Sequence, residues 1–170
     1  MINKPANGEY HAFYQTYISK LEKDNILEVL QDQAKEIPKL LRGISEEKSK
    51  YQYAEGKWSV AQLLHHIIDT ERIFAYRAFA IARGDKASFP GMDQDDYNDA
   101  AFTENRSLES LIKEFEAVRA STLSFFETMD ESVVANVGTV SDFPITVRGN
   151  VGIIAGHAAH HIDILKERYL

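Results

Sequence analysis

Apolar residues recur at intervals of three or four along four stretches of the chain, which is the period of a helix with one buried face. The stretches predict helices over residues 25–42, 60–83, 108–129 and 147–169. Residues whose hydroxyl oxygens often cap helix N-termini stand just before three of them: Ser59, Ser107 and Thr146. Four helices of this length, with no internal repeat between them, predict an all-α fold.

The second predicted helix is apolar over much of its circumference. A helix on the outside of a bundle needs only one apolar stripe, so this breadth is expected of a helix that is buried on more than one side. Its own bundle would cover one side and a second subunit another. The sequence therefore predicts a homodimer.

Two connections between these helices have distinctive compositions. The segment Pro90 to Tyr97 combines a Pro-Gly pair with several acids, which predicts an ordered turn and loop, and long loops in compact domains are often functional. Three of its acidic residues have a spacing that resembles that of a calcium-binding loop: Asp93, Asp95 and Asp96. The glycine and glutamate of an EF-hand do not follow, which favours a solvated loop. Residues 137–147 are β-prone and predict a short hairpin or an extended loop.

Composition limits the number of domains, the partners and the cellular location that can be expected. A chain of 170 residues, 44% of them apolar, can bury one core, so residues 1–170 are expected to form a single domain. The net charge of −7 opposes binding to phosphate backbones, and nucleic acid is not an expected partner. The chain contains no cysteine, so a metal site must use nitrogen and oxygen ligands. No apolar run is long enough to span a bilayer and the amino-terminal residues do not resemble a signal peptide, which predicts a cytoplasmic protein without a membrane partner.

Histidines concentrate in the last predicted helix, where the chain reads Gly-His-Ala-Ala-His-His at 156–161. Side chains four residues apart leave the same face of a helix, so His157 and His161 are expected to point together. The apolar stripe of this helix places both rings toward the core and His160 at its flank.

A second pair of histidines lies in the second predicted helix. The apolar stripe there places His66 at one margin and His65 nearly opposite, so His66 is the better candidate for a site. Glu71 falls within the stripe, where an ionised carboxylate is costly without a partner. It is expected either to orient an imidazole or to pair with a buried arginine.

Three imidazoles converge if these two helices pack side by side. Neutral imidazoles bind divalent metal ions, and three protein ligands leave a coordination position open for water or substrate. Zinc and nickel are the favoured ions, with iron and manganese as alternatives. The competing interpretation is that the histidines are ordinary hydrogen-bonded core residues.

These residues closely resemble the motif of the DinB-like superfamily of four-helix-bundle metalloproteins. The residues that carry the resemblance are, in chain order, Trp58, Ser59, His66, Asp69, Glu71 and the run 157–161. It extends from about residue 26 to residue 170. It implies an up-down four-helix bundle with a long crossover connection, often assembled as a homodimer.

The resemblance also implies which histidines bind the metal. The implied ligands are His66, His157 and His161. His160 and Glu71 are candidates for residues that support these ligands without binding the metal. Characterised branches of the superfamily resemble glutathione S-transferases in chemistry, which implies a metal-dependent transferase that joins a small thiol such as bacillithiol to a small-molecule electrophile. A metal-dependent hydrolase and a non-catalytic, stress-associated metal-binding protein are the alternatives.

No protein side chain is predicted to be the nucleophile, which must come from solvent or from a small thiol. Four charged residues would contact the substrate if the long loop folds over the site: Arg72, Arg77, Asp93 and Asp95. The alternative for each is an ordinary structural or surface ion pair. A third interpretation of the whole chain is an interaction module whose histidines are merely packed inside the bundle.

Overall fold

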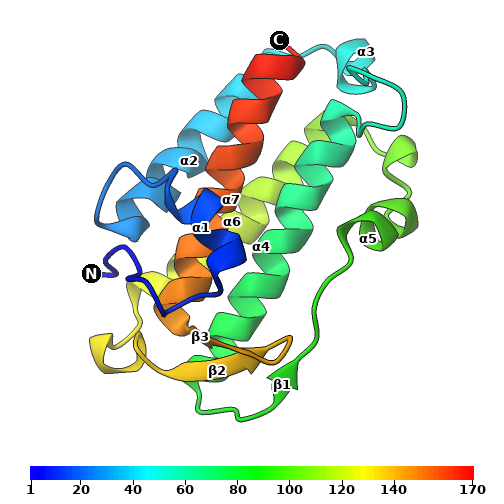
Figure 1. The fold of residues 1–170 in the computed structure, drawn as a ribbon. Coiled ribbons are helices and arrows are strands. Elements are labelled where there is room, and N and C mark those ends of the chain that lie inside the picture. The colour runs from blue at the N-terminus through cyan, green and yellow to red at the C-terminus, as the bar shows by residue number, and fades with distance from the viewer.

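Four long helices form a bundle in the computed structural model, which describes residues 1–170 (Figure 1). They are α2 (Ile26–Leu41), α4 (Val60–Ala82), α6 (Leu108–Glu127) and α7 (Val147–Arg168). In chain order they run up, down, down and up, so the connection from α4 to α6 crosses back along the bundle (Figure 1). Both α4 and α2 pack against α6 and α7. The predicted all-α bundle with a long crossover is confirmed.

Three of the long helices begin at the capping residues that the sequence predicted, whereas α2 begins after Asn25, whose side chain makes no capping bond. Ser59 accepts a hydrogen bond from the backbone N–H of Gln62, whose side chain accepts one from the backbone N–H of Ser59. This reciprocal pair satisfies two donors that a helix start leaves without partners. Ser107 and Thr146 cap α6 and α7 with one bond each, without the reciprocal bond. No helix combines the length and hydropathy that crossing a bilayer requires.

The crossover is more regular than predicted. It contains β1 (Ser88–Phe89), α5 (Gln94–Ala100) and the 3-10 turn η2 (Thr103–Asn105). Asp93 accepts hydrogen bonds from the backbone N–H groups of Asp95 and Asp96 and so caps α5. The acids are solvated, as expected, but the expectation of a loop is wrong after Asp93, because an aspartate that favours turns also supplies a helix cap.

A three-stranded sheet closes one end of the bundle, below the long helices in Figure 1. Strands β2 (Val137–Val140) and β3 (Phe143–Thr146) form the hairpin that the sequence offered as one alternative, and β1 pairs in parallel with β2. The turn residues Ser141 and Asp142 both have positive φ, 49° and 67°, as a two-residue turn matched to the strand twist requires. Thr146, the last residue of β3, directly precedes α7.

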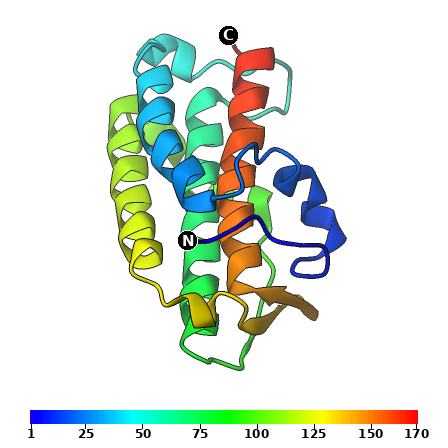
Figure 2. The same cartoon turned by 90° about the vertical axis from the view of Figure 1, so that its left-hand side faces the viewer.

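The remaining short elements are η1 (Ala12–Tyr14), α1 (Gln15–Ile18), α3 (Glu46–Ser49) and η3 (Glu131–Val133). The amino-terminal segment, which contains η1 and α1, packs against a face of α7 that carries three glycines. Figure 2 shows α1 lying beside α7. Gly149, Gly152 and Gly156 recur at three and four residues on that face, and a Cβ on Gly156 would collide with the backbone carbonyl of Tyr17. The missing side chains therefore let the segment approach the helix backbone.

We expect Gly156→Ala to destabilise the protein by about 2 kcal/mol, because the added methyl group meets backbone that cannot rotate away. Urea denaturation at neutral pH measures the change. Gly43→Ala is the milder comparison and should cost less, since its Cβ would meet the Leu40 carbonyl oxygen at 3.2 Å, a much longer distance than that to Tyr17. Equal stability of Gly156→Ala and the wild type would show that α1 is not held by this close contact.

A polar layer divides the core into two apolar clusters. At its centre Arg119 of α6 is 0% exposed and donates hydrogen bonds to Glu71 of α4 at 2.9 to 3.1 Å. It also donates to Gln33 of α2, whose amide donates to the carbonyl of Ala155 on α7. All four helices are tied together here. Of the two roles predicted for Glu71, pairing with a buried arginine is the correct one, and orienting an imidazole is wrong because its carboxylate is taken by Arg119.

Candidate metal centre

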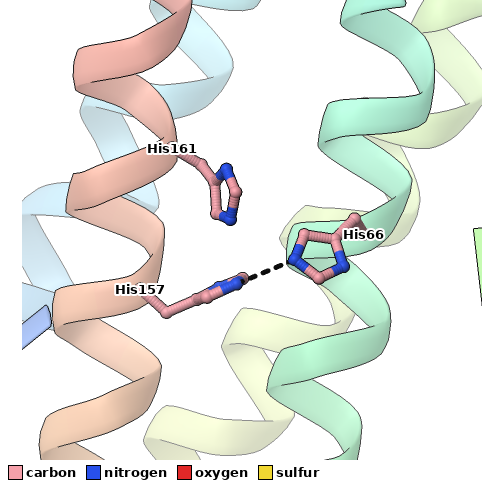
Figure 3. Close-up of side chains that lie close together, drawn as sticks. All are labelled: His66, His157 and His161. Carbon is pink, nitrogen blue, oxygen red and sulfur yellow. Dashed lines mark hydrogen bonds between the residues drawn. The ribbon is translucent and has the colours of Figure 1, made fainter. Parts of the chain in front are cut away.

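Three imidazoles from two neighbouring helices converge inside the bundle. His66 comes from α4, and His157 and His161 come from successive turns of α7. One ring nitrogen of each lies within 4.8 Å of the other two, and Figure 3 shows the rings grouped between the two helices. The Nε2 atoms of His66 and His157 are 2.9 Å apart. The packing of α4 on α7 thus produces the convergence predicted from the sequence.

These rings are buried and only partly satisfied by the protein. His66, His157 and His161 are 5%, 4% and 8% exposed. His66 and His157 share one hydrogen bond, but neither nitrogen of His161 has a partner. A buried polar atom without a hydrogen bond costs free energy and is uncommon in folded proteins. The orphaned nitrogens of His161 indicate that the cluster is built for something other than hydrogen bonding within the chain.

The donor set fits a divalent metal ion. Tetrahedral zinc with bonds of 2.0 to 2.1 Å places its nitrogen ligands roughly 3.3 Å apart. One pair of nitrogens here is slightly closer than that, and the whole set lies within 4.8 Å. Small side-chain rotations therefore suffice to bring the three nitrogens around one ion. Imidazole nitrogen suits zinc and nickel, and the geometry does not separate them from iron or manganese.

Burial keeps these imidazoles neutral, as metal ligation requires. Loss of hydration lowers the pKa of His66 to about 4. Burial, and then the charges of His66 and His160, lower the pKa of His161 to about 3. Burial first, and then the charges of His161, His66 and His160, hold the pKa of His157 well below its ordinary value. The lone pairs of all three rings are available near neutral pH.

The metal-free protein should consequently lose stability in mild acid. The unfolded chain takes up protons near the ordinary histidine pKa of about 6.5, whereas the folded protein resists until about pH 4 at His66. Stability therefore falls as the pH drops through this window, by about 2 kcal/mol at pH 5 from His66 alone. Denaturation of chelator-treated protein at pH 7.5 and pH 5 measures it. His66→Leu should show a smaller difference between the two, and an unchanged difference would contradict this origin.

Aromatic neighbours fix the orientation of two of the rings. The Trp58 ring lies 4.8 Å from that of His66, centroid to centroid, and the Trp58 carbonyl accepts a hydrogen bond from the Tyr169 hydroxyl at 2.6 Å. The Tyr17 ring meets the His157 ring edge-on at 5.2 Å. The tryptophan of the sequence motif therefore acts through packing on a candidate ligand.

The other histidines lie outside the cluster. His65 is buried, but its Nδ1 lies 2.8 Å from the Thr103 hydroxyl of the crossover, on another side of α4. His160 is half-buried and packs on Tyr17 at 5.2 Å, without a hydrogen bond to a cluster ring. His11 accepts a hydrogen bond from the backbone of Phe13 and caps η1. The expectation that His160 supports the neighbouring ligands stays a prediction.

A cavity of about 250 Å³ opens beside the cluster, and His66 and His157 form part of its wall. Of the four predicted substrate contacts only Arg77 lines it. Arg72 instead forms an ion pair with Glu114 at 2.6 Å, while Asp93 and Asp95 lie exposed at the start of α5. For Arg72 the ordinary ion pair was the correct alternative.

Sequence reasoning missed other residues of the cavity wall. Thr70 and Phe74 lie four and eight residues after His66 on α4, so they share its face. That spacing was visible in the sequence. Tyr14 and Tyr17 come from the amino-terminal segment, whose short turns carry no helical period. Only the tertiary structure brings these two rings to the histidines.

Comparisons with known proteins agree with this picture. A sequence model of the DinB superfamily matches residues 30–165, which include all three clustered histidines. A protein of Oceanobacillus iheyensis whose name describes it as a candidate metal-dependent hydrolase is 27% identical over 132 residues, 74% of this chain and 73% of that protein. YfiT from Bacillus subtilis, described as a probable metal-dependent hydrolase with an unusual four-helix bundle topology, shares the fold. Its TM-score is 0.65 at 18% identity, over 96% of this chain and 90% of YfiT.

Proposed function

This chain belongs to the DinB superfamily, and on that premise we propose that it is a metal-dependent hydrolase whose divalent ion is held by His66, His157 and His161. The observation that carries the proposal is the convergence of three buried, neutral imidazoles beside a cavity. The name of the Oceanobacillus protein and the description of YfiT, both referring to metal-dependent hydrolysis, support it.

The chain supplies the position and the surroundings of the reaction. A divalent ion bound here would supply Lewis-acid chemistry that lowers the pKa of a water molecule or thiol. The three imidazoles would hold the ion, and Trp58 and Tyr17 hold two of those imidazoles in place. Phe74 and Ile153 give the adjacent cavity apolar walls, which limit the access of bulk water to a bound substrate.

The second candidate is the transferase expected from the sequence, in which a small thiol replaces water. The absence of cysteine is compatible with it, since a thiol nucleophile must then come from outside the chain, and is equally compatible with hydrolysis. A protein that binds the metal without catalysing a reaction is the third candidate. The homodimer and the location in the cytoplasm, both expected from the sequence, also stay predictions.

A reaction panel separates these candidates. Zinc-loaded and nickel-loaded protein would be incubated with activated esters, amides and alkylating electrophiles, with water alone, bacillithiol or glutathione as the nucleophile. Hydrolysis without thiol, lost on chelation and in His157→Ala, is the expected result. Turnover only with a thiol would favour the transferase. Turnover that survives chelation, or none on any substrate, would count against a metal-dependent enzyme.

A further inference from the structure

Arg77 of α4 is a buried cation without an acidic partner. It is 4% exposed, and its guanidinium donates one hydrogen bond, from Nη2 to the carbonyl of Pro90 at 2.6 Å. It stacks over the Phe74 ring at 4.8 Å, and no carboxylate is among the groups that act on its charge. Burying a cation is costly unless an anion compensates it, and burial accordingly lowers the pKa of Arg77.

Arg119 shows how this chain stabilises a buried arginine that has a structural role. Its guanidinium is fully occupied by the Glu71 carboxylate, the Gln33 amide and the Leu30 carbonyl. The Nε and Nη1 groups of Arg77 have no such acceptors within the chain. These donors remain available to a molecule that enters from the cavity.

The cavity beside the histidines is where Arg77 presents its charge. Arg77 is the one side chain in the cavity wall that is ionised at neutral pH, since no lysine, aspartate or glutamate lines it. Thr70, also in the wall, has a buried hydroxyl oxygen without a hydrogen-bond partner. An anionic group in this cavity would therefore meet a cation and a hydroxyl that the protein leaves unsatisfied.

Arg77 and the metal centre lie along one face of α4. Thr70, Phe74 and Arg77 follow His66 by four, eight and eleven residues, which returns Thr70 and Arg77 to nearly the same side of the helix and Phe74 to within about a quarter turn of it. The backbones of His66 and Arg77 are about 16 Å apart along the axis. Helical side chains lean toward the N-terminus, and the contact of Arg77 with Phe74 shows that its side chain turns back toward the histidines.

We propose that Arg77 binds a carboxylate of the substrate, so that this protein acts on small carboxylate-bearing molecules whose reacting group lies at His66, His157 and His161. The proposal rests on the proposed metal-dependent function, because the histidines mark the other end of the bound molecule. Guanidinium and carboxylate match in charge and in fork geometry. The Arg77 to Pro90 hydrogen bond would also keep the crossover in place beside the bound carboxylate.

Paired metal-binding probes test the proposal without needing the substrate. Monohydroxamates of dicarboxylic acids, from succinate to suberate, carry a metal-binding head and a distal carboxylate. Their terminal amides are neutral counterparts of the same length. By calorimetry on zinc-loaded protein, at least one acid should bind about tenfold or more tightly than its amide. In Arg77→Met this preference should disappear while amide binding is unchanged.

Two further variants keep the result interpretable. Arg83→Met removes a cation from the end of the same helix and should leave the preference intact, because Arg83 does not line the cavity. Arg77→Lys retains the charge without the forked guanidinium and should keep part of the preference. It serves as the test variant if Arg77→Met does not fold. Equal binding of every acid and its amide by the wild type would overturn the Arg77 proposal. Failure of all hydroxamates to show zinc-dependent binding would instead contradict the metal site.

The carboxylate could belong to the electrophile or to a thiol cosubstrate, and a second probe pair distinguishes the two. 3-Mercaptopropionate and its amide bind a metal through sulfur. If the wild type binds 3-mercaptopropionate more tightly than its amide, and Arg77→Met does not, the carboxylate belongs to the nucleophile. If only the hydroxamates show this Arg77-dependent difference between acid and amide, the carboxylate belongs to the electrophile.

Discussion

His157→Ala should abolish stoichiometric metal binding. Wild-type protein purified without an affinity tag should contain about one divalent ion per chain, as three histidine ligands predict. Loss of one ligand leaves two imidazoles and an apolar gap. Removing residues that merely support ligands weakens metal affinity by about 10- to 100-fold, so removing a ligand should exceed that. Elemental analysis by mass spectrometry, with native mass spectrometry for stoichiometry, measures the change.

The matched control is His160→Ala on the same helix. It also removes an imidazole within one turn of the cluster, but His160 is half-buried and does not belong to the group of converging nitrogens. Its metal content should therefore fall far less than that of His157→Ala, even though the His160 ring packs on His161. Equal loss in both variants would mean that the metal binds elsewhere or that any histidine change disturbs α7. Equal retention in both would reject His157 as a ligand.

Arg119→Met should be the most destabilising single change outside the histidine cluster. It leaves Glu71 buried without its partner, and breaking a buried ion pair in this way costs about 3 to 5 kcal/mol. The side-chain carbonyl of Gln33 also loses the hydrogen bond that it accepts from Arg119. Urea denaturation followed by circular dichroism gives the change in the free energy of unfolding.

The double variant Arg119→Met with Glu71→Leu tests the cause. It removes both charges and fills the space with apolar side chains, so most of the lost stability should return. A double variant no more stable than Arg119→Met would show that the cost comes from packing rather than from an unpaired carboxylate. Both variants should still bind metal when folded, because neither residue contacts a clustered histidine.

The helices could be predicted from the sequence because local features specify them. Ser59, Ser107 and Thr146 cap helices through bonds to residues three positions away, and the apolar period marks each buried face. The pair His157 and His161 was equally local, since one helical turn separates them. For His66 the helical period left its orientation open, and the resemblance to a family motif singled it out.

What remained unpredicted depends on contacts between distant parts of the chain. Nothing near Glu71 in the sequence identifies Arg119, which lies 48 residues away, as its partner. The same holds for Tyr17, which reaches the site because a glycine of α7 lets α1 approach closely. Arg77 was named as a possible contact, but only the tertiary structure shows that no carboxylate lies beside it.

Anomalous diffraction from crystals of protein reconstituted with one equivalent of zinc tests the central claim most directly. The account predicts one strong peak at the zinc edge, about 2.0 to 2.1 Å from a ring nitrogen of each of His66, His157 and His161. A peak at any other place, or three imidazoles joined only by hydrogen bonds with no peak between them, would contradict it.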